Sequence, residues 1–232
     1  MNNILNNKII ERYSRQIVLK NVGPIGQKKI IKSKVLVIGA GGLGCPIVDY
    51  LCRAGIGTIG IADHDKVNIS NLHRQSFYNL SDVGKFKVNV LKKKIKLINK
   101  SINIKTFLKK INKNNFENIL KNFDIIVDGS DNFKTKFLLN KYSIKYKKIL
   151  ISGAISKFDG HVFTFSFKDN KSPCLRCFFQ EEEISDDILN CEYEGVLGTV
   201  AGIIGTIQAN EILKQILKLG KNLNGYILIV DL

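Results

Sequence analysis

Residues 35–46 read VLVIGAGGLGCP, an apolar run that enters a turn with glycines at Gly39, Gly41 and Gly44. The apolar run is typical of a buried β-strand. The G-x-G-x-x-G spacing is typical of a tight turn that opens a helix and lets the backbone approach phosphate groups. The stretch therefore predicts a nucleotide-binding turn, and it leaves open whether the nucleotide is NAD or a triphosphate.

The segments around this turn continue an alternation of strands and helices. Strands are predicted at 34–38, 58–62, 102–108, 123–127 and 149–152, and helices at 43–54, 85–97, 116–120 and 133–146. This alternation predicts an α/β fold with a doubly wound, Rossmann-like and mostly parallel sheet. A long helix is expected over 195–218, and two C-terminal strands at 160–167 and 225–230 are predicted to be antiparallel.

Composition narrows the class of protein. The chain has 232 residues, 44% of them hydrophobic, which is enough for one large core, so residues 1–232 are predicted to form a single domain. No secretion signal and no apolar run of membrane-spanning length is visible, so we expect a cytoplasmic protein without a membrane partner.

The net charge of +16 makes nucleic acid a partner to consider, because a strongly basic surface attracts phosphate groups. Only five of the 36 basic residues are arginines, however, and the lysines are scattered, so no nucleic-acid partner is expected.

Polar and charged residues follow the ends of several predicted strands, at the edge where doubly wound sheets bind ligands. They are Asp63, Asn71, Arg74, Lys87, Asp131 and Asn132. An acidic residue after the second strand holds ribose hydroxyls, while cations and a carboxylate suited to Mg²⁺ neutralise a leaving phosphate. Hydride transfer needs no such charge, so the set predicts a nucleoside triphosphate site. In the alternative interpretations, Arg74 forms a surface salt bridge, Lys87 is a solvated lysine and Asp131 caps a helix.

Eight segments carry a resemblance to a known family. They read RYSRQ at 12–16, VIGAGGLG at 37–44, SNLHRQ at 70–75, VGKFK at 83–87, DGSDN at 128–132, SGA at 152–154, CLRC at 174–177 and GVLGTVAGIIGTIQANEILK at 195–214. In these segments, and over nearly its whole length, the chain resembles the ThiF/MoeB/HesA family, relatives of ubiquitin-activating enzymes. The resemblance implies a ubiquitin-like sulfur carrier protein as partner. It also implies adenylation of the carrier's C-terminal glycine, with ATP and Mg²⁺ as cofactors and pyrophosphate as product.

The resemblance also implies roles for individual residues. Those implied to bind the nucleotide and its metal are Gly39, Gly41, Gly42, Asp63, Ser70, Asn71, Arg74, Lys87, Asp131 and Asn132, with Asp131 placing Mg²⁺. The implied catalytic set is Arg15, Arg74, Lys87 and Asp131. In the family, the arginine that matches Arg15 reaches into the active site of the other subunit, which implies a homodimer. In the alternative, Arg12 and Arg15 pair with acidic residues of their own subunit.

Three cysteines bear on metal and sulfur chemistry. Cys174 and Cys177 have the spacing of half a tetrahedral zinc site, but no second C-x-x-C follows, so we expect an incomplete site without zinc. Cys191, in NCEYEG, stands where ThiF-like members carry a cysteine that forms a sulfur linkage to the carrier, so it is a further candidate catalytic residue. Glu192 and Glu194 disfavour its thiolate, and an unreactive loop cysteine is the alternative.

Two other functions stay open on this basis. An NAD(P)-dependent oxidoreductase would need no role for Arg74, Lys87 or Asp131. A non-catalytic subunit of the family would not adenylate, and the presence of Arg15 with the whole triphosphate set argues against it. The carrier is expected to be ThiS-like or MoaD-like, serving thiamine thiazole or molybdopterin synthesis, and Cys191 favours the thiazole carrier.

Overall fold

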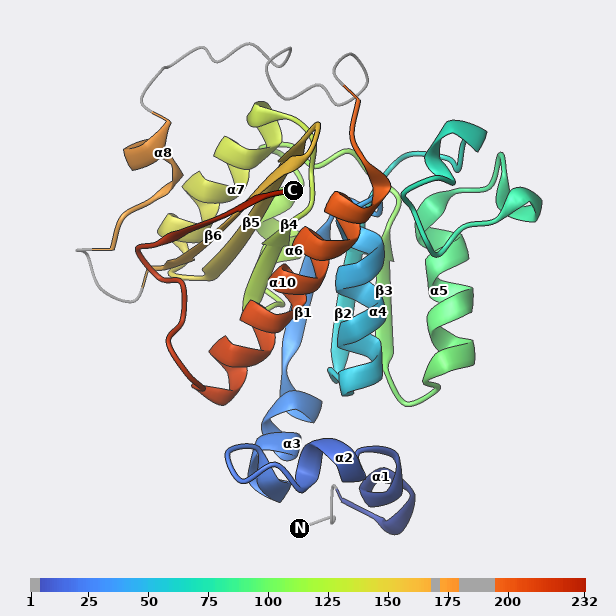
Figure 1. Cartoon of the computed structure of the whole chain (residues 1–232), viewed down its shortest axis with the longest axis vertical. Helices are drawn as coiled ribbons and strands as arrows, with labels where there is room; N and C mark the ends of the chain where they lie inside the picture. The colour runs from blue at the N-terminus through green and yellow to red at the C-terminus, as the bar shows by residue number, and fades with distance from the viewer. Residues whose placement is uncertain (1–4, 168–171, 180–194) are drawn as a thin grey trace.

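The computed structural model describes residues 5–167, 172–179 and 195–232. In chain order, and as labelled in Figure 1, the helices and strands are α1 (Asn7–Arg12), α2 (Ser14–Ile17), α3 (Gly23–Lys32), β1 (Lys34–Ile38), α4 (Gly44–Ala54), β2 (Thr58–Ala62), α5 (Lys87–Ile98), β3 (Asn103–Phe107), α6 (Phe116–Leu120), β4 (Ile125–Asp128), α7 (Phe133–Lys145), β5 (Ile149–Ser156), β6 (Asp159–Ser166), α8 (Leu175–Phe178), α10 (Gly198–Leu217) and β7 (Ile227–Asp231). Two short 3₁₀ helices, Ile69–Asn71 and Leu80–Asp82, lie between β2 and α5.

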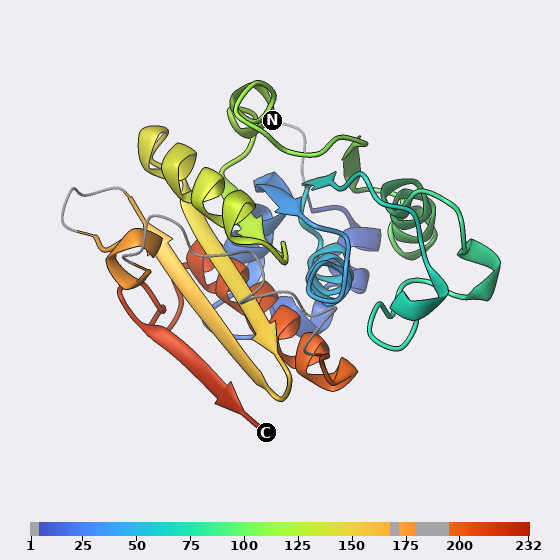
Figure 2. The ribbon, with the colours of Figure 1, turned by 90° about the horizontal axis from the view of Figure 1, so that it is seen from above.

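One seven-stranded sheet, with the strand order β3-β2-β1-β4-β5-β6-β7, runs through the described part of the chain. β1 to β5 are parallel, whereas β6 and β7 are antiparallel to their neighbours. The predicted α/β fold with antiparallel C-terminal strands is therefore confirmed. The chain builds the sheet outward from β1 to β2 and β3, and then from β4 onward on the other side of β1, as seen from above in Figure 2. In doubly wound sheets, the carboxyl ends of the strands at such a reversal form the ligand-binding crevice.

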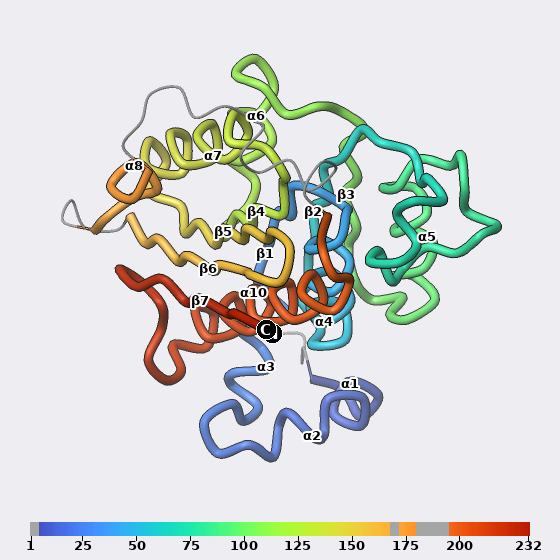
Figure 3. The backbone as a smooth tube through the Cα atoms, turned by 45° about the horizontal axis from the view of Figure 1, so that its top comes forward, coloured from blue at the N-terminus to red at the C-terminus, as the bar shows by residue number. Residues whose placement is uncertain are grey.

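Helices cover both faces of the sheet, as Figure 3 shows. α4, α5 and α10 pack on one face, and α6, α7 and α8 pack on the other. Alternate residues of β1 follow this division, because Val35 and Val37 belong to the first core and Leu36 and Ile38 to the second. All four side chains are buried, as expected of a central strand that is covered on both faces.

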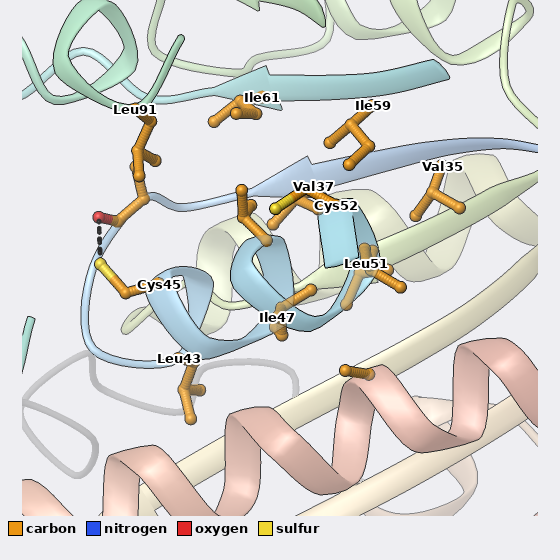
Figure 4. Packing of buried hydrophobic residues seen from close by; sticks show 14 of the residues in the cluster. Val35, Val37, Leu43, Cys45, Ile47, Leu51, Cys52, Ile59, Ile61 and Leu91 are labelled. Atoms are coloured by element: carbon orange, nitrogen blue, oxygen red, sulfur yellow. Dashed lines mark hydrogen bonds between the residues drawn. The ribbon is translucent and has the colours of Figure 1, made fainter. Parts of the chain in front are cut away.

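The glycine turn leads from β1 directly into α4, whose inner side packs against the sheet (Figure 4). Cys45, Ile47 and Leu51 are fully buried, in the layer of α4 between the sheet and α10. Burying an aliphatic side chain such as Ile or Leu stabilises a fold by about 1.5–3 kcal/mol. A Cβ atom on Gly44 would lie 2.1 Å from the carbonyl oxygen of Gly39, so only glycine lets the helix begin this close to the strand end.

The three N-terminal helices, α1 to α3, lie at the amino end of the sheet and were not predicted (Figure 1). Tyr13 is 4% exposed, and its hydroxyl accepts a hydrogen bond from Nδ2 of Asn99 at 2.8 Å. The side-chain amides of Gln16 and Gln27 both donate to the carbonyl oxygen of Ala54, at 3.2 and 3.1 Å. These contacts attach the N-terminal segment to the last turn of α4 and to Asn99 at the end of α5.

The other predicted elements are present, with ends that differ by a few residues. β4 is Ile125–Asp128 where a strand at 123–127 was predicted, and α10 is Gly198–Leu217 where a helix over 195–218 was predicted. β5 continues to Ser156, beyond the predicted end at 152, because it forms a hairpin in which Ser156 pairs with Asp159. No helix in the described ranges combines the length and the apolar character that crossing a membrane requires.

Candidate active site

A cavity of about 430 Å³ opens where β1, β2, β4 and β5 reach their carboxyl ends. This is the reversal point of the strand order, where the doubly wound topology places ligands. The ten residues predicted to bind a nucleotide and its metal all line it: Gly39, Gly41, Gly42, Asp63, Ser70, Asn71, Arg74, Lys87, Asp131 and Asn132. The fold thus brings together side chains from segments that lie far apart in the chain.

The glycine turn forms one wall of the cavity. Gly39 has φ +93°, and a Cβ atom there would lie 2.6 Å from the carbonyl oxygen of Gly129, so conformation and space both require glycine. Among the described residues, the amides of Gly41, Gly42 and Leu43 have no acceptor, and no side chain caps the start of α4. Unpaired amide donors at a helix N-terminus favour phosphate oxygens.

Asp63 follows β2 and joins two backbone segments. Its Oδ2 accepts a hydrogen bond from the amide of Ala40, and its Oδ1 accepts one from the amide of Asp65, both at 2.7 Å. Burial raises the pKa of the Asp63 carboxyl, while the ammonium group of Lys87 and the two backbone donors oppose that rise. Each carboxylate oxygen keeps a further lone pair, which suits the ribose hydroxyls of a nucleotide.

Arg74 and Lys87 are the two cations of the predicted set in the cavity wall. Lys87 is 6% exposed, and its Nζ lies 3.2 Å from Oδ2 of Asp65. The guanidinium of Arg74 donates to the carbonyl oxygen of Ser70 at 3.1 Å and to Nε2 of His73 at 2.6 Å, and no carboxylate of the described ranges pairs with it. Lys87 is therefore not a solvated lysine, and Arg74 is not in a surface salt bridge within those ranges.

The turn after β4 carries Asp131 and Asn132. Asn132 caps α7, because its Oδ1 accepts a hydrogen bond from the amide of Thr135 at 2.9 Å. The alternative prediction, in which Asp131 caps this helix, is therefore wrong. Asp131 is exposed, and within the described part of the chain its carboxylate accepts only from Nδ2 of Asn132, at 3.2 Å. Its second oxygen is available to a ligand, and carboxylate oxygens are the donors that Mg²⁺ prefers, so the residue fits a magnesium ion.

Residues 13–232 match the ThiF family. The chain belongs to the ThiF family. This match confirms the resemblance to the family that the sequence motifs indicated. Individual proteins are also similar to the chain over most of its length. The chain is 38% identical over 225 residues to a sulfur carrier protein adenylyltransferase of Thermus thermophilus, covering 96% of this chain and 83% of that protein.

Two further relatives of this chain are longer than it is. It is 39% identical over 222 residues to a probable molybdopterin-synthase adenylyltransferase of Gracilaria tenuistipitata var. liui, with 96% of this chain and 62% of that protein covered. It is 42% identical over 229 residues to the adenylyltransferase and sulfurtransferase MOCS3 of Aedes aegypti, with 99% and 52% covered. The chain therefore spans only about half to two thirds of the length of these two relatives.

Solved structures show the same fold. The crystal structure of PaaA superimposes with a TM-score of 0.83 at 22% identity, covering 100% of this chain and 73% of that one. The crystal structure of Escherichia coli MccB with ATP gives a TM-score of 0.78 at 24% identity, covering 98% and 69%. At these identities the likeness concerns the fold alone.

Arg15 is the predicted site residue that lies away from the cavity of this ThiF-family chain. It is exposed on α2, which lies with the other N-terminal helices at the amino end of the sheet (Figure 1). No side chain of the described residues pairs with it, and Arg12 donates to the carbonyl oxygen of Ile98 at 3.1 Å. The alternative prediction, in which both arginines pair with acids of their own subunit, is not seen in the described ranges.

Cys174 and Cys177 lie together at the start of α8, with their Sγ atoms 3.9 Å apart. Within the described ranges, no third cysteine, histidine or acidic residue joins them in a group that could hold a metal. The half zinc site expected from the spacing of the two cysteines stays a prediction. Cys191 lies outside the described residues.

Three buried polar residues of the ThiF-family site were not predicted: Gln75, Asp128 and Lys136. Gln75 is 3% exposed and lines the cavity, and its Oε1 has no hydrogen-bond partner in the described structure. Asp128 and Lys136 form an ion pair with a distance of 3.0 Å between Oδ2 and Nζ. Asp128 and Gln75 fall inside the matching segments DGSDN and SNLHRQ, whereas no spacing or motif distinguishes Lys136 from the many other lysines.

Proposed function

We propose that this chain adenylates the C-terminal glycine of a ubiquitin-like sulfur carrier protein, using ATP and Mg²⁺ and releasing pyrophosphate. One observation carries the proposal: a single cavity combines free amide donors, an acid for ribose, the cations Arg74 and Lys87, and a carboxylate that fits Mg²⁺. Membership of the ThiF family and the names of the relatives support it. Because the chain spans only part of two relatives, the partner and the substrate belong to the proposal.

The reaction needs no proton transfer in its first step. The terminal carboxylate of the carrier is ionised at neutral pH, so it attacks the α-phosphorus of ATP without a general base. A carboxylate oxygen bonds to phosphorus while the bond from phosphorus to the bridging oxygen breaks, and pyrophosphate leaves with that electron pair. Arg74 and Lys87 would offset the charge of the phosphates. Asp131 would act as a ligand of Mg²⁺, which when bound neutralises further charge on the leaving group.

The experiment is ATP–pyrophosphate exchange in the presence of Mg²⁺, with ThiS-like and MoaD-like carriers that end in Gly-Gly. We expect exchange that depends on the carrier, and the carrier with the higher rate identifies the thiazole or the molybdopterin pathway. An NAD(P)-dependent oxidoreductase or a non-catalytic subunit would give no exchange. Folded protein that shows no exchange with either class of carrier would contradict the proposal.

We further propose that residues 1–232 act as one cytoplasmic adenylyltransferase unit in a homodimer, in which Arg15 completes the cavity of the partner. Two observations support this arrangement. Arg15 is exposed and unpaired among the described residues, and α2 lies at the opposite end of the sheet from the cavity of its own subunit. The neighbouring segment also exposes Val18 by 74%, Leu19 by 55% and Ile25 by 73%, and adjoining exposed apolar side chains are typical of an interface.

Mixed variants test the proposed dimer. Arg15→Ala and Arg74→Ala should each abolish exchange, because each removes one cation from every site. In a hybrid dimer, one cavity contains Arg74 and receives Arg15 from the other chain. An equal mixture after random subunit exchange should therefore regain about one quarter of the wild-type activity. No recovery, with subunit exchange confirmed by mass labelling, would show that Arg15 does not act across an interface.

A further inference from the structure

An ion pair is buried in the wall of the proposed site, because Lys136 lines the cavity and pairs with Asp128 behind it. Asp128, the last residue of β4, is fully buried, and Lys136 on α7 is 2% exposed. Removing two charges from water costs free energy that their attraction seldom exceeds, and apolar side chains of similar volume often stabilise a protein at least as well. Stability alone therefore does not account for two charges at this position.

The carboxylate of Asp128 holds three segments together. Its Oδ1 accepts hydrogen bonds from the amide and the hydroxyl of Ser130, at 2.9 and 2.6 Å. Its Oδ2 accepts from the hydroxyl of Ser152 at 2.6 Å and from Nζ of Lys136 at 3.0 Å. Nζ of Lys136 also donates to the carbonyl oxygen of Gly153 at 2.6 Å. The turn after β4, the first turns of α7 and the middle of β5 are thus joined at one charged centre.

The helix α10 contacts the end of β4 from the other face of the sheet. Gln208, on α10, is fully buried, and its Nε2 donates to the carbonyl oxygen of Asp128 at 2.9 Å. Gly153 leaves the space for this side chain, because a Cβ atom there would lie 2.4 Å from Oε1 of Gln208. The end of β4 is therefore fixed by side chains from both layers of helices.

Asp131 lies in the turn that these hydrogen bonds hold in place. Its own side chain has one hydrogen bond in the described structure, the one from Asn132. The position of its carboxylate is thus determined by the backbone of the 129–132 turn. That turn is held at one end by Asp128, through Ser130, and at the other end by α7, whose cap is Asn132 and whose next turn contains Lys136.

We propose that Asp128 and Lys136 form a positioning pair that holds the 129–132 turn, so that Asp131 reaches Mg²⁺ and the α-phosphate of a bound nucleotide. The proposal deepens the proposed function and rests on it for the identity of the nucleotide. Neither residue of the pair takes part in bond making or breaking. Loss of the pair should therefore weaken the response to Mg²⁺ more than the binding of metal-free nucleotide.

Three variants separate positioning from stability. Lys136→Met and Asp128→Asn each leave an unbalanced buried group, whereas the double variant removes both charges and keeps side chains of similar size. Glu211→Gln is the matched control, because Glu211 is a carboxylate that is 2% exposed and accepts hydrogen bonds from Lys214 and from the amide of Leu223, away from the cavity. The double variant should regain most of the thermal stability that the single variants lose.

Two measurements on the full chain test the proposal. The first is the Mg²⁺ concentration that half-saturates the binding of a fluorescent ATP analogue. It should rise about 10- to 100-fold in the double variant, clearly more than the dissociation constant of the metal-free analogue rises. The second needs no ligand: amide hydrogen exchange in the 129–132 peptide should be faster in the double variant than in the Glu211→Gln control. Each variant is measured at the same number of degrees below its own melting temperature.

The outcomes are distinct. A double variant with a wild-type response to Mg²⁺, or with exchange in the 129–132 peptide no faster than in the control, would show that the pair is only structural. Failure of the proposed function would look different, because the wild type would then bind the nucleotide with Mg²⁺ but show no pyrophosphate exchange with any carrier. In that case, the binding and hydrogen-exchange measurements would still decide the role of the pair.

Discussion

Replacing Asp131 with alanine separates the chemistry of the cavity from the stability of the fold. Asp131 is exposed and accepts one hydrogen bond within the described residues, so its loss should cost about 0.5–1 kcal/mol of unfolding free energy. For a chain of this length, that is a fall in melting temperature of about 1–4 °C. Removing one group that stabilises transition-state charge typically lowers kcat about 10²- to 10³-fold. The expected variant is therefore folded and nearly inactive.

The control for this variant lies at the other end of the same strand. Asp124 precedes β4, is exposed, and its Oδ2 accepts a hydrogen bond from the amide of Lys34 at 3.0 Å. Asp124→Ala therefore removes the same charge and one hydrogen bond, and we expect a similar fall in melting temperature with an unchanged rate of carrier-dependent pyrophosphate exchange. Full activity of Asp131→Ala would refute the metal assignment. A much larger loss of stability than in Asp124→Ala would refute the argument that Asp131 has no structural role.

Two further predictions concern stability. Gly39 and Gly84 have similar φ values, +93° and +84°, but only at Gly39 would a Cβ atom meet another atom, the carbonyl oxygen of Gly129. Gly84→Ala should lower the free energy of unfolding by about 1 kcal/mol, and Gly39→Ala should lower it clearly more. If urea titrations gave equal losses for the two variants, the clash of a Cβ atom at Gly39 would not matter. Burial acts to raise the pKa of Asp82, but hydrogen bonds from Lys94 and a backbone amide outweigh it and hold the pKa below its usual 3.8. Asp82 therefore contributes stability above pH 3.8 that is lost as the pH falls below that value. Lys94→Met should reduce this acid sensitivity, and an unchanged acid limb of the melting curve against pH would contradict it.

The cavity was predictable wherever the backbone dictates the residue type. Gly39 and Gly44 are required by a positive φ and by contacts that leave no room for a Cβ atom, so their spacing is visible in the sequence. Asp63 and Asp131 were found because they follow apolar runs, and strand ends meet at one edge of a parallel sheet. At these positions, the local sequence pattern is enough to predict where the residue lies in the fold.

Other features depend on contacts that no local pattern records. The helices α1 and α2 have six and four residues, too few for a clear apolar period, and partners distant in the chain, such as Asn99 for Tyr13, hold them in place. Lysine is usually exposed to solvent, so the sequence gives no sign that Lys136 is buried. Only the packing of α7 against β5 shows that it is buried against Asp128. Long-range contacts thus account for most of what was missed.

The central claim is the formation of an acyl-adenylate on a carrier protein, and intact mass spectrometry of the carrier tests it directly. A candidate carrier ending in Gly-Gly is incubated with the protein, ATP and Mg²⁺, quenched in acid and measured. The account predicts a carrier species heavier by one AMP less one water. That species should be absent when ATP or the C-terminal glycine is omitted, and absent with Asp131→Ala. Carriers of unchanged mass, with folded protein and both classes of carrier, would contradict the account.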